Sequence, residues 1–302
     1  MNWSLIHLGI ALAASPLLLS VINRTKAFFG GRKGQPLLQP YYDLIKLFRK
    51  GAVYSTTTSW IFKAGPMAGF SVIILILLLL PLGVFPSVIS FQGDLILLIY
   101  LLGLMRFFYV LAALDTGSSF EGMGASREMF FAPFCELALI LSLSAVARAS
   151  HNNSLTGMML GLGGVVTGQK LQLMIFTGVA LLIVLLTENA RIPVDDPNTH
   201  LELTMIHEVM VLDHCGTDLG FIHYTACLKL WISSALLVST VQQVRSGTVV
   251  LDFFLYLAGM FAVALVVGII ESVMARLRLN KIPLMVTAAI VFAVLALIIP
   301  VR

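Results

Sequence analysis

The sequence predicts an all-α, polytopic integral membrane protein, with about eight transmembrane helices and one amphipathic interfacial helix in a single membrane domain over residues 1–302. Hydrophobic residues make up 59% of the chain and charged residues only 11%, and the mean hydropathy is +0.97. Soluble domains carry about 25% charged residues, so a soluble globular enzyme is excluded. The polar fraction is too low for a disordered chain, and three cysteines are too few for a disulfide scaffold.

Eight apolar stretches are each long enough to cross a bilayer, which takes about 20 residues of helix. They cover residues 3–22, 64–86, 95–114, 129–149, 170–188, 224–244, 252–273 and 283–301. The first stretch is expected to stay in the protein, because no basic segment precedes it and no small-residue cleavage site follows it. A glycine-rich stretch at 157–168 is expected to lie partly in the membrane interface.

The connections between the spans divide into a basic set and a set with few basic residues. Eight lysines and arginines lie between residues 24 and 63, whereas the opposite side receives only Arg148, Lys170, Arg245 and Arg302. By the positive-inside rule the basic side is cytoplasmic, so both termini face outwards. The cytoplasmic loops are then approximately residues 24–63, 115–128, 188–223 and 274–282.

The net charge of +4 and the isoelectric point near 9.0 follow from this topology and suit the anionic headgroups of a lipid bilayer. They therefore do not indicate a nucleic-acid partner. The three cysteines form no CxxC pair, so the sequence predicts neither a zinc site nor an iron–sulfur site. We expect no catalytic centre, no bound cofactor and no metal in this chain.

The first cytoplasmic loop contains an amphipathic segment that follows Pro40. Between Tyr41 and Lys50, apolar and charged residues recur at helical spacing. Such a helix is expected to lie in the membrane interface, and by itself it predicts a surface helix without chemistry. The second loop is rich in glycine but has neither a GxxxxGK[ST] nor a GxGxxG motif, so a nucleotide site is not indicated. Ser126 is expected to begin the fourth span.

The third loop, between residues 187 and 229, is rich in acids, which is the reverse of the usual cytoplasmic bias. A carboxylate-rich proton inlet, a docking surface for a partner or a merely solvated loop would each account for it. Apolar residues between 201 and 212 predict that part of it is a packed helix.

Three histidines in this loop, His200, His207 and His214, recur every seven residues and would share one helical face. Two helical turns separate their side chains by about 11 Å, which is too far for a single metal ion. The run from His207 to Val211 also departs from HExxH at its fifth position. We expect buried or buffering histidines instead.

Ionisable residues inside the spans carry more information, because a charge in the bilayer is costly. Arg106 in the third span and Glu136 in the fourth lie at equal depth, roughly 12 Å from the cytoplasmic side, so an ion pair between them is predicted. Glu188 ends the fifth span, and Glu271 lies near the cytoplasmic end of the seventh. Each is either a relay carboxylate or a partner of a nearby arginine, Arg191 for Glu188 and Arg276 or Arg278 for Glu271.

Four motifs in order resemble the respiratory complex I subunit 1 superfamily over nearly the whole chain. They are GQPLLQPYYDLIKL at 34–47, ASRE at 125–128, ENARIPVD at 188–195 and ESVMARLR at 271–278. The quinone-linked branch of that superfamily typically has a Glu-Gly-Glu-Ser-Glu-Leu run after its Arg-Pro-x-Asp element. Here residues 195–208 read DDPNTHLELTMIHE, which is similar to the membrane anchor of energy-conserving group 4 nickel–iron (NiFe) hydrogenases of the formate hydrogenlyase and hydrogenase-4 types.

The resemblance implies a non-redox subunit of a hydrogenase complex in a bacterial or archaeal cytoplasmic (inner) membrane. It would anchor the redox module and couple electron transfer to H⁺ or Na⁺ translocation. The 4Fe–4S clusters and the NiFe centre would belong to an iron–sulfur small subunit and a hydrogenase large subunit, and antiporter-like membrane subunits would be neighbours. The alternatives are a quinone-reactive subunit 1 of a complex I-type dehydrogenase and a purely structural anchor. An independent carrier is disfavoured because no inverted repeat is visible.

On this interpretation two sets of site residues are predicted. The expected ion-coupling or proton-relay residues are Arg106, Glu136, Glu188, Asp195, Glu202, Glu208 and Glu271. The expected partner-docking residues are Arg32, Asp43, Lys46, Arg127, Glu128, Arg191 and Asp213.

Overall fold

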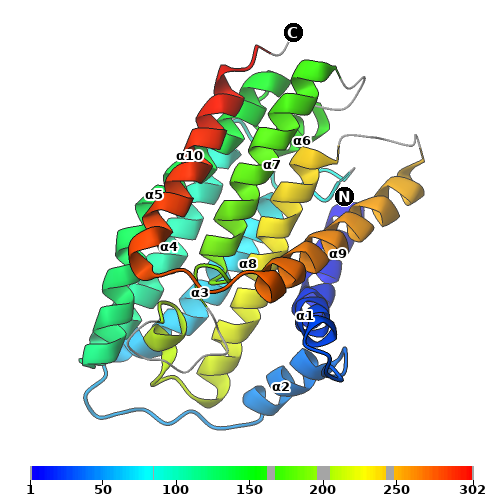
Figure 1. The fold of residues 1–302 in the computed structure, drawn as a ribbon. Coiled ribbons are helices and arrows are strands. Elements are labelled where there is room, and N and C mark those ends of the chain that lie inside the picture. The colour runs from blue at the N-terminus through cyan, green and yellow to red at the C-terminus, as the bar shows by residue number, and fades with distance from the viewer. Residues whose placement is uncertain (1, 84, 162–166, 196–204, 243–247, 301–302) are drawn as a thin grey trace.

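The computed structural model describes residues 2–83, 85–161, 167–195, 205–242 and 248–300. Over these ranges the chain is a bundle of helices without a β-strand (Figure 1). The α-helices are α1 (Asn2–Phe29), α2 (Gln39–Phe48), α3 (Trp60–Leu79), α4 (Asp94–Asp115), α5 (Ser119–Ser150), α6 (Leu155–Gly161), α7 (Gly168–Glu188), α8 (Gly216–Val241), α9 (Val249–Val273) and α10 (Ile282–Ile298). Two short 3₁₀ helices, η1 (Glu208–Val211) and η2 (Leu279–Lys281), complete the elements.

Eight of these helices are long and apolar enough to cross a membrane, as predicted. They are α1, α3, α4, α5, α7, α8, α9 and the segment η2–α10. Figure 1 shows that α1 begins and α10 ends on the side opposite to α2. We call the side that carries α2 and residues 205–215 the loop side.

Helix α8 lies at the centre of the bundle and packs against α1, α2, α3, α7 and α9. Its Trp231 is fully buried. Around it, α3 pairs with α4, α1 with α9, and α10 with both α5 and α7. Small residues allow the close pairs: a Cβ at Gly65 would lie 2.8 Å from the Cβ of Ala112, and one at Gly268 would lie 2.7 Å from that of Thr25. Close backbone approach at small residues is the usual basis of helix packing in lipid.

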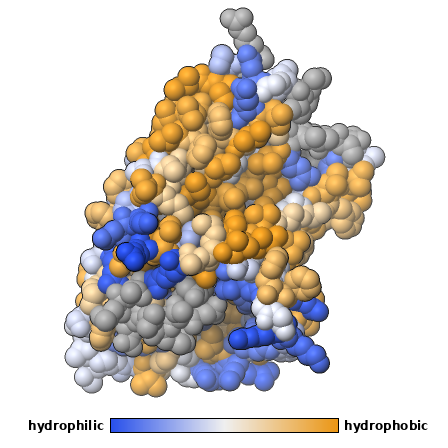
Figure 2. Space-filling model, viewed as in Figure 1, coloured by the Kyte–Doolittle hydropathy of each residue, from blue (hydrophilic) through white to orange (hydrophobic). Residues whose placement is uncertain are grey.

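The face of the bundle seen in Figure 2 is apolar along most of its length, and most of its hydrophilic residues lie toward the loop side, with a smaller group at the opposite end. Large side chains such as Tyr100, Phe107 and Phe254 are exposed on the spans. A soluble protein rarely exposes so much apolar surface, whereas lipid chains cover it at no cost.

Helix α5 begins at Ser119, so the prediction that the fourth span starts at Ser126 was wrong. Gly122 and Gly124 of the second loop lie inside the helix, whereas Gly117 lies in the turn before it. Gly124 faces the segment 205–215. A Cβ there would lie 2.2 Å from Cγ1 of Val209 and 2.9 Å from the carbonyl oxygen of Ile206. A glycine is therefore needed at position 124 because α5 and the loop are in close contact, and not because the chain forms a flexible turn there.

The third loop is also shorter than predicted, because α8 begins at Gly216. Its described part, 205–215, contains only the short helix η1, so the packed helix expected over 201–212 is replaced there by one 3₁₀ turn. His207 and His214 consequently do not share a helical face, and His200 lies outside the described residues. Helix α2 takes Pro40 into its first turn, where a missing N–H leaves no hydrogen bond unmade. Part of the glycine-rich stretch forms α6.

Candidate functional site

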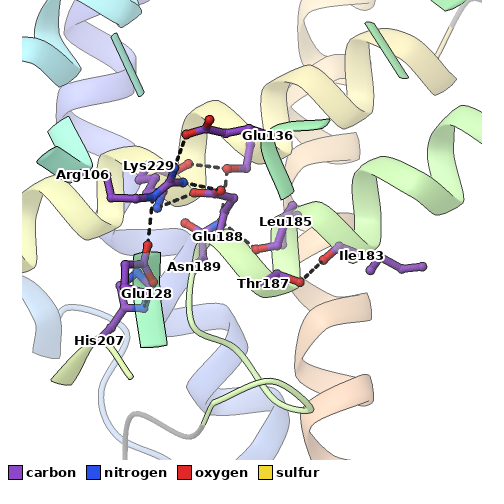
Figure 3. Close-up of polar contacts among 11 residues, drawn as sticks. Arg106, Glu128, Glu136, Ile183, Leu185, Thr187, Glu188, Asn189, His207 and Lys229 are labelled. Carbon is purple, nitrogen blue, oxygen red and sulfur yellow. Dashed lines mark hydrogen bonds and ion pairs between the residues drawn. The ribbon is translucent and has the colours of Figure 1, made fainter. Parts of the chain in front are cut away.

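Arg106 of α4 is buried in the bundle and contacts three carboxylates (Figure 3). Its Nε donates to Oε1 of Glu128 at 3.0 Å, and its Nη2 donates to Oε1 of Glu188 at 2.6 Å. Its Nη1 forms an ion pair with Glu136, which confirms the predicted pair. We call Arg106, Glu128, Glu136, Glu188 and Lys229 the arginine cluster.

Side chains from α4, α5 and α7 meet at Arg106. Glu128 and Glu136 both lie on α5, and eight residues of helix separate them by roughly 12 Å along its axis. Arg106 reaches across from α4 between them, and its planar fork donates in several directions at once. Glu188, the last residue of α7, meets the same fork from a third helix.

Lys229 of α8 completes the cluster, with its Nζ 2.8 Å from Oε2 of Glu188. The end of α7 is held beside it, because Nδ2 of Asn189 donates to the carbonyl of Leu185 and to Oγ of Ser233. Glu188 therefore pairs with Arg106 and Lys229. Arg191, the partner predicted for it from the sequence, contacts Glu271 instead. The signal for Lys229 was present in the sequence, since a lysine within an apolar span is costly without a partner.

Exposure is unequal across the cluster. The side chains of Arg106, Glu128 and Glu188 are 7%, 9% and 10% exposed, whereas that of Glu136 is 34% exposed. Two cations face three carboxylates, so the fully ionised cluster carries one excess negative charge. Such an excess favours binding of one more positive charge.

A second ionic group lies between α1 and α9. Glu271 is fully buried, and its Oε2 is 2.9 Å from Nζ of Lys26 while its Oε1 is 3.6 Å from Nη1 of Arg191. The predicted alternative partner Arg276 pairs instead with Asp195, at 2.8 Å. The reason is that α9 ends at Val273 and the chain continues in extended conformation, which carries Arg276 away from Glu271.

Residues 205–215, which we call the clamped loop, are held at their backbone by side chains from other segments. Oδ2 of Asp195 accepts the N–H of Ile206 at 2.8 Å and that of His207 at 3.3 Å. Nη1 of Arg127 donates to the carbonyl of Met205 at 2.8 Å. Oε1 of Glu121 accepts the N–H of Asp213 at 3.0 Å.

The two described histidines of the third loop differ in environment. His214 is buried and stacks on Phe62, with ring centroids 3.9 Å apart and planes within 5°. Burial lowers the pKa of His214 from 6.5 to about 4, because the charged form loses its hydration. His207 is 31% exposed, and its Nδ1 lies 3.4 Å from Oε2 of Glu128.

Most of the remaining predicted site residues lie on the surface, are half-buried or fall outside the residues that the structure describes. Exposed positions are Arg32, Asp43, Lys46 and Asp213. Glu208 begins η1 and is half-buried. Glu202 lies outside the described residues, and Glu128, predicted for docking, lies in the arginine cluster. Within the part of the chain that the structure describes, no group of three or more His, Cys, Asp and Glu side chains is arranged to hold a metal ion.

Comparison with known proteins agrees with this architecture. The chain is 27% identical over 302 residues to formate hydrogenlyase subunit 4 of Escherichia coli K12, covering 98% of this chain and 97% of the relative. It is 29% identical over 278 residues to hydrogenase-4 component C of the same organism, covering 89% and 86% of the two chains.

The fold is shared with a chain in the solved structure of the membrane-bound sulfane sulfur reductase, an archaeal respiratory membrane complex. The TM-score is 0.80 and the identity 23%, over 97% of this chain and 98% of that one. A family model described as NADH dehydrogenase matches residues 2–301. Since that match takes in every membrane-spanning helix, this chain belongs to the NADH dehydrogenase family of membrane subunits, the complex I subunit 1 family.

Proposed function

We propose that this chain is the membrane-anchoring and ion-coupling subunit of a multisubunit, energy-conserving NiFe hydrogenase related to formate hydrogenlyase. It links electron transfer in a peripheral module to translocation of H⁺ or Na⁺. The names of its two relatives support the hydrogenase assignment. The arginine cluster is the single observation that carries the coupling role.

An anchor alone does not need this cluster. Each ion moved from water into a protein interior costs several kcal/mol, and replacing buried ion pairs with apolar residues is often neutral or stabilising. Three carboxylates on one arginine inside the spans are therefore expensive for a structural purpose. The same arrangement suits a site that gains and loses a positive charge, since intramembrane carboxylates mark ion pathways.

The clamped loop offers a physical connection between a docked module and this site. Asp195, Arg127 and Glu121 hold its backbone, and His207 on the same loop contacts Glu128. A partner that moves the clamped loop would change the electrostatic environment of Glu128 and thereby the charge that the cluster holds. The large and small hydrogenase subunits, with their NiFe centre and 4Fe–4S clusters, are the proposed partners on the loop side, which we assign to the cytoplasm.

The test of assembly is to purify the chain from membranes in mild detergent, identify its co-purifying subunits by mass spectrometry and assay viologen-linked hydrogen turnover. Hydrogenase subunits with hydrogen turnover are expected. A flavin- and quinone-linked set of subunits without hydrogen activity would contradict the proposal and favour the quinone-reactive alternative.

The test of coupling is Glu136→Gln, which neutralises the most exposed carboxylate of the cluster while keeping its shape. We expect the complex to assemble and to turn over hydrogen, but ion uptake per hydrogen into inverted vesicles should fall about tenfold or more. The control is Lys170→Gln, which removes a charge on α7 outside the contacts of the arginine cluster. Repeating the uptake assay with and without Na⁺ identifies the ion. Unchanged uptake in Glu136→Gln would leave the chain as a structural anchor.

A further inference from the structure

We propose that His207 is the proton-exchange group through which the loop side loads and unloads the arginine cluster. The inference rests on the proposed coupling function and specifies the proton as the ion. His207 Nδ1 lies 3.4 Å from Oε2 of Glu128, while Oε1 of the same carboxylate accepts from Arg106 at 3.0 Å (Figure 3). The histidine and the arginine therefore contact opposite oxygens of one carboxylate.

Side-chain exposure decreases from His207 to the arginine cluster, which indicates a path for a proton from the loop side. His207 is 31% exposed, whereas Glu128, Arg106 and Glu188 behind it are each about one-tenth exposed or less. A proton that reaches the ring from water has one short step to the first buried carboxylate. Histidine suits this step because its two ring nitrogens can accept a proton on one side and release one on the other near neutral pH.

The backbone around His207 is unusually well held for a loop. Asp195 accepts the N–H groups of both Ile206 and His207, and Arg127 donates to the carbonyl of the preceding Met205. The carboxylate of Asp195 is itself paired with Arg276. The backbone that carries the His207 side chain is therefore held in place beside Glu128, and a small rotation of the ring would bring Nδ1 within the usual hydrogen-bonding distance of Oε2.

Charged groups from several segments lie around His207. Glu128 faces its ring, and Glu188 interacts with it electrostatically from α7. Arg106 lies behind Glu128, and Arg127 on α5 reaches the clamped loop two residues away. Asp195 approaches only the backbone N–H, and Glu208 is the next residue along the chain.

The proton step balances without a further reactant. The neutral ring takes a proton from hydronium at one nitrogen, and the imidazolium passes a proton from Nδ1 to the ionised carboxylate of Glu128, which becomes neutral. The ring returns to its neutral form after tautomer exchange. Reversal of the same steps releases the proton to the loop side.

The experiment uses the intact complex in inverted membrane vesicles, with hydrogen evolution driven by formate or reduced ferredoxin, whichever the purified complex accepts. Proton movement is followed with an acridine dye, and hydrogen turnover is measured in the same sample. The variants are His207→Gln and His207→Asn, the second of which keeps a donor close to the position of Nδ1. The control is His223→Gln, a histidine on α8 outside the contacts of the arginine cluster.

We expect both His207 variants to keep the co-purifying subunits and to lose about tenfold or more in proton movement per hydrogen. Exogenous imidazole should restore much of that loss, because the site is reachable from water, and the pH dependence of uptake should flatten. His223→Gln should behave as the unmodified complex.

Two outcomes would overturn the inference. One is proton movement per hydrogen in His207→Gln equal to that of His223→Gln. The other is a loss that imidazole does not restore and that leaves the pH dependence unchanged, since that describes a structural contact. If Glu136→Gln uncouples while His207→Gln does not, only the role of His207 fails. If neither variant uncouples, the proposed function fails with it.

Discussion

Arg106 shows how one side chain organises a site in a membrane. Its guanidinium group has five N–H donors in a fixed plane, and the carboxylates of Glu128, Glu136 and Glu188 meet that plane from different directions. A lysine has one compact charge and no such fork, so Arg106→Lys is not a conservative change. Loss of one partner from a buried ion pair commonly costs about 3–5 kcal/mol, because the other charge stays buried.

His214 carries a pH-dependent prediction at the same scale. Its pKa is about 4 in the folded protein against 6.5 in the reference state, so the unfolded chain binds a proton first as the pH falls. The contribution of His214 to the free energy of unfolding is therefore fully present above about pH 6.5. It decreases by up to roughly 3 kcal/mol as the pH falls from 6.5 to 4.

The measurement is the melting temperature of the detergent-solubilised protein as a function of pH. His214→Phe keeps a flat ring against Phe62 but cannot be protonated, so its melting temperature should fall less on acidification than that of the unmodified protein. His223→Gln serves as the control. Identical pH dependence in the His214→Phe variant and the unmodified protein would show that His214 does not contribute.

At the scale of elements, the contact between α5 and the clamped loop decides the geometry of the site. Gly124 permits that contact, because any side chain at this position would overlap Val209 and the carbonyl of Ile206. About one turn further along the same helix, Glu128 meets His207, and about three turns further, Glu136 meets Arg106. Displacement of the clamped loop from α5 would therefore disturb the arginine cluster directly.

A matched pair of substitutions on α5 tests this contact. Gly122→Ala adds a methyl group into open space and should stabilise the helix by about 0.5–1 kcal/mol. Gly124→Ala adds the same methyl group against Val209 and should destabilise the protein by about 1–3 kcal/mol. Thermal unfolding in detergent compares the two variants. Equal effects of both would show that the loop does not pack on α5 as described.

For the whole molecule, the arrangement of the helices places the two ionic groups and the clamped loop toward one side of the membrane. We expect that side to face the cytoplasm, as the positive-inside rule predicts. The chain carries a natural probe for this assignment, because Cys215 at the start of α8 is half-exposed whereas Cys135 and Cys227 are buried.

We expect a membrane-impermeant maleimide to label Cys215 in inverted vesicles and not in intact spheroplasts. Cys215→Ser should remove the signal, which controls for reaction at the two buried cysteines. Labelling from the outer side would invert the proposed topology and place the docking surface outside the cell.

The amino-acid sequence by itself determined the membrane class, the number of spans and the common level of Arg106 and Glu136 along their helices. These are local properties, because insertion into lipid depends on the length of an apolar run and depth depends on the rise of the helix. For that reason the Arg106–Glu136 pair could be predicted from the positions of the two residues relative to the loops.

Only the tertiary structure decided which charges meet. Glu188, Lys229 and Glu128 join Arg106, and Glu271 joins Lys26 and Arg191, through the rotation of each helix about its axis. That rotation is set by packing against neighbours, such as the close approaches at Gly65 and Gly268, which join residues far apart in the chain. The starts of α5 and α8 were mispredicted for the same reason. The first turns of α5 pack on the clamped loop at Gly124, and the first turns of α8 pack against Leu47, Phe48 and Gly51 of the first loop, so tertiary contacts stabilise turns that look like polar loop in sequence.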